Sequence, residues 1–439
     1  MPPESGSAGS GSDSGKKFGD RVARLEDPAL IAGRGRFIDD IRLPEMAHAA
    51  FVRSPHAHAL ILSIDKSAAL EIDGVIAVFT LADFRPHLAV ERMVVGLPSP
   101  SYKQERDRPA LADGEVVHVG EAVAIIVAEN RYIAEDAASM VFVEYDLLTP
   151  VADCRAALEP GATLVHRNSP HNELAAFDLG YGDVDRVFAT APHVYAESFW
   201  QHRGGSHSIE GRGCVAVYDE TKRKLTFFSS TQASHSVKAV LVEMLGWDEN
   251  RVRIVTPDVG GGFGPKVVFY PEDISTALAA ILLGRPVKWT EDRREHFIAT
   301  TQERDQYWDV EIAVDDDGLV LGLRGTLIHD HGAYTARGIN LAYNSALVVT
   351  LPYEIPAYHL GVRLALTNKV PSTPVRGAGH PQGIFVMERM LDRAARELGI
   401  DRAEIRHRNL VPPEKIPYVR PLKSRGDTAV LLDSGDYPA

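Results

Sequence analysis

Residues 256–268, TPDVGGGFGPKVV, contain four glycines around a single phenylalanine. Glycine loses more conformational entropy on folding than any other residue, so such a cluster indicates an unusual backbone conformation or a close approach to the backbone. The β-branched residues of VRIVTP (252–257) before it are typical of a strand, and a helix is predicted over 272–284. A strand, a glycine loop and a helix in this order are the arrangement in which backbone N–H groups bind a phosphate.

The spacing of these glycines matches neither G-x-G-x-x-G nor G-x-x-x-x-G-K-[ST], so a tight structural turn remains an alternative. A second cluster, TPVRGAGHPQG (373–383), places Arg376 among small residues between a predicted strand and a helix predicted over 382–399. An arginine in this setting can present its planar fork to an anionic group, or it can cap local carbonyls. Two such clusters favour one ligand bound from two sides.

The length, composition, net charge and cysteine count of the chain argue against several classes of function. The chain has 439 residues, which suits two or three domains, and its apolar fraction of 45% and charged fraction of 24% are ordinary for a globular protein. Its net charge of −13 argues against a nucleic-acid partner. Its only cysteines, Cys154 and Cys214, cannot hold an iron–sulfur cluster, and they favour a reducing, cytoplasmic setting over a disulfide framework.

No segment predicts a secretory signal or a membrane helix. The first residues, MPPESGSAGSGSDSGKKFG (1–19), are rich in serine and glycine, so we expect a disordered tail over 1–16. The longest apolar run, residues 274–284, is much shorter than the ~18–20 residues that a bilayer requires. We therefore expect no membrane partner.

The remaining pattern predicts a mixed α/β (α+β) protein. We expect a compact α/β domain over 17–150, a surface linker over 151–185 and a larger domain over 186–439. Residues 46–65 are predicted to form a hairpin around Ser54-Pro55, and residues 306–332 a strand pair that turns at Asp317-Gly318. Residues 411–439 are rich in proline and turn residues, so no closing element is expected there.

Eight segments, in order, carry a resemblance to a known family: GRGRFIDDI (33–41), VRSPHAHALI (52–61), VGEAVAIIVAE (119–129), VGGGFGPK (259–266), RPVKWTEDRREHF (285–297), HGAYTARG (331–338), VRGAGHPQ (375–382) and ELGIDRAEIRHRNL (397–410). Together they resemble the molybdopterin-binding large subunit of the xanthine dehydrogenase/aldehyde oxidase family of molybdenum hydroxylases. The resemblance implies an α/β hammerhead domain over about 20–150, followed by the first half of the molybdenum-cofactor domain over about 170–439.

The resemblance also implies roles for individual residues. Gly262, Phe263 and Gly264 would present backbone amides to the cofactor, and Arg376 would contact it. Gln201 in FWQHRGGSHSIEGRG would lie above the metal, upstream of the Glu210 of that segment, although the spacing differs from that of purine-oxidising relatives. The alternative for Gln201 is a polar strand residue at the domain surface.

Two departures from the family pattern concern the substrate. Ala378 stands where purine-oxidising relatives carry a phenylalanine, and Val267 stands where they carry a substrate-orienting glutamate, so we do not expect xanthine as the substrate. We also do not expect Arg337 to face a substrate, because the loop length there differs. His329, Asp330 and His331 are expected in a solvated loop rather than at a metal site, and no metal-ligating residue is assigned in this chain.

The chemistry implied by the resemblance is hydroxylation, with water, of a carbon next to a ring nitrogen or in a carbonyl group. Its general base is a glutamate near the end of the complete large subunit, and this sequence stops at DSGDYPA (433–439) before that region. We therefore assign no catalytic residue to this chain and expect the base on a partner chain, as in split nicotinate-dehydrogenase-like enzymes. A truncated half of the same enzyme and a non-catalytic structural subunit are the alternatives.

The expected cofactor is molybdenum-molybdopterin, which bacterial relatives usually carry as the cytosine dinucleotide. The expected partners are a second molybdopterin-binding subunit, a 2Fe-2S iron–sulfur subunit and an FAD subunit, with a small-molecule N-heterocycle or aldehyde as substrate. Carbon monoxide is excluded as a substrate, because its oxidation in the family needs a cysteine near the position of Arg376, and VPSTPVRGAGHP (370–381) has none.

Overall fold

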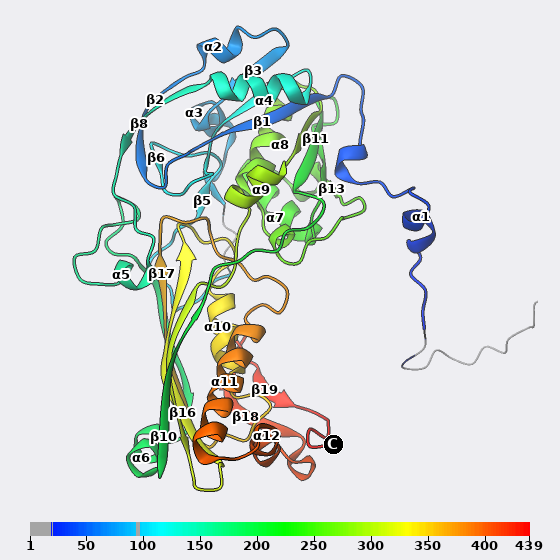
Figure 1. Cartoon of the computed structure of the whole chain (residues 1–439). Helices are drawn as coiled ribbons and strands as arrows, with labels where there is room; N and C mark the ends of the chain where they lie inside the picture. The colour runs from blue at the N-terminus through cyan, green and yellow to red at the C-terminus, as the bar shows by residue number, and fades with distance from the viewer. Residues whose placement is uncertain (1–18, 20, 94–96) are drawn as a thin grey trace, which may run out of the picture. The chain divides into compact units, whose positions relative to one another are not determined.

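The computed structural model describes residue 19, residues 21–93 and residues 97–439 (Figure 1). The chain divides into two compact units, Met1–Arg36 and Phe37–Ala439. The described residues of the first unit contain one short helix, α1 (Asp27–Ile31). The tail expected over residues 1–16 lies outside the described residues.

A seven-stranded sheet organises one half of the second unit (Figure 1). Its strands, in spatial order, are β13 (Val252–Val255), β12 (Lys224–Ser229), β11 (Gly213–Asp219), β14 (Val287–Thr290), β1 (Ala47–Arg53), β7 (Ala122–Ala128) and β3 (Val75–Phe79). Helices α7 (Ser234–Leu245) and α8 (Pro271–Leu283) pack on one face, and α4 (Arg131–Met140) with α2 (Ser67–Leu70) packs on the other. Strands from both expected domains therefore share one sheet, through the parallel pair β1–β14.

The hairpin expected over residues 46–65 is wrong. Strand β1 is buried on both faces, with Phe51 packed in one apolar cluster and Ala50 in the other. A central strand needs a neighbour on each side, and β1 pairs with β7 and β14. The following strand β2 (Ala59–Asp65) instead joins a three-stranded sheet with β6 (Glu115–Val116) and β8 (Phe142–Leu147). Strand β7, which lies between β1 and β3, is buried along its whole length.

The other half of the unit is built on a five-stranded sheet in the order β10 (His193–Gln201), β15 (Gln306–Val314), β16 (Val320–Gly332), β17 (Tyr358–Leu366) and β9 (Glu173–Tyr181). Helices α10 (Asn340–Val348) and α11 (His380–Leu398) contact this sheet, and so do the short helices α5 (Cys154–Ala157) and α6 (Val184–Thr190). The turn predicted at Gly318 is confirmed, with a φ of 81° between β15 and β16.

Two segments are more ordered than their composition suggests. The expectation of a surface linker is wrong for residues 173–181, because β9 pairs with β17 and buries Leu174 and Ala175 completely. The expectation of no closing element after residue 411 is also wrong, because β18 (Tyr418–Lys423) and β19 (Ala429–Leu432) form an antiparallel pair. Arg420 of β18 is buried and donates to the carbonyl oxygen of Tyr353 at 2.6 Å.

Both large sheets combine parallel with antiparallel pairs, and helices pack against each, so the mixed α/β fold class is confirmed. The remaining small sheets are the β6–β2–β8 sheet, the β18–β19 pair and the pair of β4 (Arg92–Met93) with β5 (Arg108–Pro109). Within the described residues, no helix is both long enough and apolar enough to cross a lipid bilayer.

We expect Leu174→Ala to destabilise the fold, because the side chain of Leu174 is fully buried in the core around the five-stranded sheet. Truncating a buried leucine costs about 2–5 kcal/mol. Chemical denaturation measures the loss directly. The matched control is Leu62→Ala, which makes the same chemical change at a side chain that is 58% exposed. Equal stability of the two variants would contradict the assignment of β9 to the core.

Candidate cofactor-binding site

The glycine loop follows β13 and leads into the short 3₁₀ helix η4 (Pro265–Val267). Its backbone is in the left-handed region at Gly261, Phe263 and Gly264, with φ values of 95°, 54° and 124°. A Cβ on Gly262 would lie 2.4 Å from the amide oxygen of Gln232, and one on Gly264 would lie 2.3 Å from the carbonyl oxygen of Pro374. The glycines are therefore required by the approach of other segments of this same chain.

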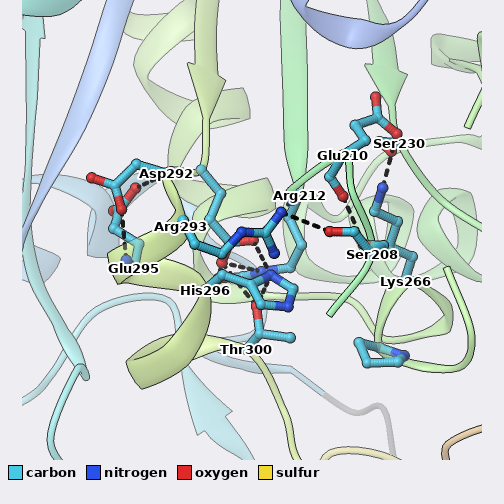
Figure 2. A network of polar contacts seen from close by, with 12 residues as sticks. Ser208, Glu210, Arg212, Ser230, Lys266, Asp292, Arg293, Glu295, His296 and Thr300 are labelled. Atoms are coloured by element: carbon cyan, nitrogen blue, oxygen red, sulfur yellow. Dashed lines mark hydrogen bonds and ion pairs between the residues drawn. The ribbon is translucent and has the colours of Figure 1, made fainter. Parts of the chain in front are cut away.

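One carboxylate holds the start of this loop (Figure 2). Oε2 of Glu210 accepts hydrogen bonds from the amide of Gly260 at 2.8 Å, from Oγ of Ser230 at 2.7 Å and from Nζ of Lys266 at 2.8 Å. Burial lowers the pKa of Lys266, and the Glu210 carboxylate opposes that effect. Charge-assisted hydrogen bonds of this kind are about twice as strong as neutral ones.

A buried network of charges supports the segment that carries Glu210 (Figure 2). Arg212 pairs with Glu272 of α8 at 3.0 Å and with Glu291 at 2.6 Å, and Arg53 of β1 pairs with Glu272 at 2.8 Å. Burial alone would raise the pKa of Glu272, but Arg212 and Arg53 lower it to about 2. Nδ1 of His296, in α9 (Arg293–Ala299), donates to the Glu291 carboxylate at 2.8 Å.

The second glycine cluster touches the first. The amide of Arg376 donates to the carbonyl oxygen of Phe263 at 2.7 Å, next to the contact between Gly264 and Pro374. Ala378 has a φ of 50°, and its carbonyl oxygen accepts from Nδ2 of Asn344 on α10 at 2.9 Å. The structure thus brings together the two clusters that the sequence places about 110 residues apart, and it leaves the Arg376 side chain exposed beside them.

Gln201 ends strand β10 and lies against the first turn of α11. Its Nε2 donates to the carbonyl oxygen of Gln382 at 3.0 Å, and its Oε1 is buried without a hydrogen-bond partner in the described part of the chain. Nε2 of Gln382 donates to Glu303 at 3.3 Å, and burial raises the pKa of that glutamate. Gln201 is therefore neither an ordinary surface residue nor fully satisfied by its protein neighbours.

A bound group would find several unused hydrogen-bonding atoms here. The amides of Gly262 and Phe263 donate to no acceptor among the residues that the structure describes, and the Arg376 guanidinium makes no ion pair among them. Together with the free Oε1 of Gln201, these donors and this acceptor fit a large polar group with anionic parts. Val267, in η4, and Ala378 are both partly buried near this junction.

Three residues at the site were not predicted to act there. Asn344 and Gln382 hold the Ala378 turn and the Gln201 side chain, and no local pattern marks Asn344, whereas Gln382 closes the VRGAGHPQ segment. Gln232, three residues after the end of β12, accepts from the amide of Gly264 at 2.9 Å, which is a structural role.

The expectation of a solvated loop at residues 329–331 is wrong. His329, Asp330 and His331 end strand β16 and are at most 1% exposed. Asp330 pairs with Lys369 at 2.8 Å, and burial lowers the pKa of His331 to about 3. Among the described residues, no group of three or more histidine, cysteine, aspartate or glutamate side chains is placed to hold a metal ion.

Comparison with known families gives two matches. Residues 32–149 match the aldehyde oxidase and xanthine dehydrogenase a/b hammerhead domain, and residues 165–410 match the molybdopterin cofactor-binding domain. The order of the two domains is the one that the resemblance implied.

Individual relatives support the same family assignment. The carbon monoxide dehydrogenase large chain of Hydrogenophaga pseudoflava is 38% identical over 95% of this chain and 54% of its own length. The nicotine 6-hydroxylase large subunit of Paenarthrobacter nicotinovorans is 36% identical over 96% of this chain and 52% of its own length. The crystal structure of quinoline 2-oxidoreductase from Pseudomonas putida 86 superposes with a TM-score of 0.88, at 34% identity, over 95% of this chain and 52% of that one.

This chain therefore spans about half the length of these relatives. For a more distant relative, the match covers most of the length of both chains. The nicotinate dehydrogenase large molybdopterin subunit of Eubacterium barkeri is 27% identical, and the match covers 89% of this chain and 88% of that subunit.

We expect Glu210→Gln to loosen the glycine loop, because it keeps the side-chain volume but removes the charge that Lys266 and the Gly260 amide contact. Leaving one buried charge without its partner costs about 3 kcal/mol. Hydrogen exchange of the amides over residues 260–264 measures the effect, and it should become faster. The control is Glu220→Gln at an exposed turn. Unchanged exchange in Glu210→Gln would show that the carboxylate does not hold the loop.

We expect Glu272→Gln to lower stability at pH 7 by about 3 kcal/mol, the size of a shift from an unfolded pKa near 4.5 to a folded pKa of about 2. A depressed carboxyl pKa stabilises the fold above the unfolded pKa and stops doing so as the pH falls through the folded pKa. The difference between wild type and variant should therefore shrink as the pH falls from about 4.5 to about 2. Urea midpoints over this range measure it, and a constant difference would contradict the assignment.

Proposed function

Because this chain belongs to the molybdopterin-binding subunits of the xanthine dehydrogenase and aldehyde oxidase family, we propose that it forms one side of the active site of a multi-subunit molybdenum hydroxylase. In this proposal the enzyme oxidises an N-heteroaromatic compound or an aldehyde and takes the new oxygen from water. The single observation that carries it is the contact of the two glycine clusters, where Phe263 accepts from the amide of Arg376 at 2.7 Å.

The residues of this chain would bind and orient the cofactor. Gly262 and Phe263 would donate their free amides, Gly264 would allow the close contact of the two turns, and Arg376 would offer its guanidinium to an anionic part. Oε1 of Gln201 would accept from the bound group. When bound, the molybdenum–molybdopterin group supplies the redox chemistry of the hydroxylation.

We place the substrate next to Val267 and Ala378. Both side chains are small and partly buried. The amide of Val267 donates to the carbonyl oxygen of Gly264 at 2.9 Å, and the amide of Ala378 donates to that of Val375 at 2.6 Å, in the turn that carries Arg376. Small side chains leave room for a planar ring, and neither offers a hydrogen bond to a purine. An aromatic or aldehyde substrate other than xanthine is therefore the class that we propose.

We propose further that the general base lies on a second molybdopterin-binding polypeptide, and that electrons leave through 2Fe-2S and FAD subunits in the cytoplasm. The Eubacterium barkeri subunit supports this view, because it matches nearly its whole length to this chain. The two buried free thiols, Cys154 and Cys214, fit a reducing compartment. The cytosine dinucleotide form of the pterin is proposed from the resemblance alone.

Carbon monoxide is not the substrate that we propose, although large chains of carbon monoxide dehydrogenases are among the relatives. That chemistry needs a cysteine in the turn that carries Arg376. The two cysteines of this chain lie elsewhere, Cys154 on α5 and Cys214 on β11.

We expect the tagged chain, purified gently from its native cell, to carry near-stoichiometric molybdenum together with iron held by accompanying subunits. In Arg376→Ala the molybdenum content should fall at least ~10-fold, because hydrogen bonds to charged groups contribute about 1.5–3 kcal/mol each. Metal analysis of the eluate measures both. The control is Arg186→Ala, whose side chain on α6 is 72% exposed.

Equal molybdenum in wild type and Arg376→Ala would remove Arg376 from the cofactor site. A wild-type chain that is free of molybdenum would favour the alternative of a non-catalytic structural subunit. A chain that carries molybdenum would then be assayed with N-heterocycles and aldehydes, with a dye as the electron acceptor.

A further inference from the structure

The five-stranded sheet has two edge strands, and only one of them is covered by this chain. At β9 the amide of Lys103 donates to the carbonyl oxygen of Leu174 at 2.9 Å, so a neighbouring segment pairs with that edge. At β10 the ladder with β15 is the only backbone pairing in the described part of the chain, so its outer edge is open. An open edge of nine residues is a template for one more strand.

A groove lies beside this open edge, between β10 and the second half of α11. Its volume is about 350 Å³, much more than the ~30 Å³ of one water molecule. Glu197 and Phe199 form the β10 wall and point towards α11. The Glu197 carboxylate accepts from Arg393 at 2.7 Å, and the ring of Phe199 packs edge-on against Phe385 with 5.6 Å between their centroids. We call this site the β10 groove.

The opposite wall of the β10 groove is rich in arginine side chains that are weakly paired or unpaired. Arg389 makes no ion pair with any residue that the structure describes. Arg396 approaches the carboxylate of Glu397 only to 4.0 Å. Arg402 approaches the carboxylate of Asp392 only to 3.9 Å. These three guanidinium groups therefore keep hydrogen-bond donors for a further anionic partner.

The carboxylates at the groove already have other partners. Glu197 pairs with Arg393, and Asp392 pairs at 2.9 Å with Arg406 of α12 (Arg402–Asn409). Glu397, just outside the groove, pairs with Arg393 at 3.0 Å. Four arginines and two carboxylates line the groove, so its positive charge exceeds its negative charge. Because the whole chain has a net charge of −13, this positive site stands out and favours an acidic partner.

The other face of the β10 edge is apolar. Side chains alternate between the two faces of a strand, so Val194 and Trp200 lie on the face opposite to Glu197 and Phe199. They are 40% and 61% exposed. The Trp200 ring stacks on Tyr307 of β15, with 5.8 Å between the centroids. A strand added beside β10 would therefore meet arginines on one face and apolar side chains on the other.

We propose that the β10 groove is a docking site for an extended segment of a partner protein in which acidic and apolar residues alternate. The segment pairs with the open edge of β10, about 4.8 Å away, as strands in a sheet do. Its carboxylates contact Arg389, Arg396 and Arg402, and its apolar side chains cover Val194 and Trp200. This docking site uses none of the residues assigned to the cofactor, so it goes beyond the proposed function and does not depend on it.

The test uses three capped peptides as probes. Glu-Val-Glu-Val-Glu-Val has the proposed pattern, Gln-Val-Gln-Val-Gln-Val has the same shape without charge, and Glu-Glu-Glu-Val-Val-Val has the same composition without alternation. Isothermal titration calorimetry of the full chain should show that the first peptide binds at least ~10-fold more tightly than either of the others.

The combined substitution of Arg389→Gln, Arg396→Gln and Arg402→Gln should weaken binding of the alternating acidic peptide at least ~10-fold, because three contacts between charged groups are lost together. None of these side chains holds a close ion pair within the described structure, so the variant should keep its fold. Urea midpoints check that it does.

The matched control combines Arg186→Gln, Arg223→Gln and Arg253→Gln, which remove the same charge at exposed side chains away from the groove. This control variant should bind the acidic peptide as the wild type does.

Equal affinity for the acidic and the uncharged peptide, or equal affinity in the wild type and the groove variant, would overturn the proposal. Equal affinity for the peptide without alternation would also overturn it, because no strand would then be added to β10. A chain that dimerises in sedimentation and loses the dimer on addition of the peptide would assign the edge to a second copy and overturn the choice of partner. Peptide binding by a chain free of molybdenum would contradict the proposed function and leave this inference standing.

Discussion

The structure around the glycine loop depends on the carboxylate of Glu210. Its Oε2 accepts hydrogen bonds from three donors, which are the amide of Gly260, Oγ of Ser230 and Nζ of Lys266. Its Oε1 accepts from the amide of Ile38 at 3.4 Å. Two residues later, Arg212 enters the buried ion pairs with Glu272 and Glu291. Each of these charges would be costly alone in the interior, so they fix one backbone path between the loop and the seven-stranded sheet.

This backbone path explains why the loop needs glycines, and the reason differs from that in a phosphate-binding loop. Gly260, Gly262 and Gly264 are each crowded by an atom of this chain, from Glu210, Gln232 and Pro374 respectively, at no more than 2.5 Å from an added Cβ. The glycine cluster therefore allows two turns of the protein to pack closely together. This packing creates a candidate ligand site, because the two adjoining turns expose unpaired amides and the Arg376 guanidinium in one place.

The sequence predicts those parts whose signal is local. A continuous apolar run marks β7 and a helical pattern marks α11, and the shared motifs mark Arg376 and the glycine loop. The predictions of a hairpin over residues 46–65 and of a surface linker over 173–181 are wrong, because the partner of a strand depends on residues far away in the chain. β1 pairs with β14 across more than two hundred residues, and β9 pairs with β17. The Gln201–Gln382 contact is hidden for the same reason, since no spacing rule connects residues 181 positions apart.

Three large apolar side chains on and near the glycine loop are exposed to solvent. Phe263 and Phe297 are 42% and 52% exposed, and Ile209, between Ser208 and Glu210, is 93% exposed. The backbone at Ile209 is held in place, because Arg293 donates to the carbonyl oxygens of both Ser208 and Ile209. A rigid backbone that presents apolar side chains to water is costly unless something covers them. Under the proposed function a second molybdopterin-binding polypeptide would cover them, so the charges that hold Glu210 in place would also shape the surface on which the rest of the active site is assembled.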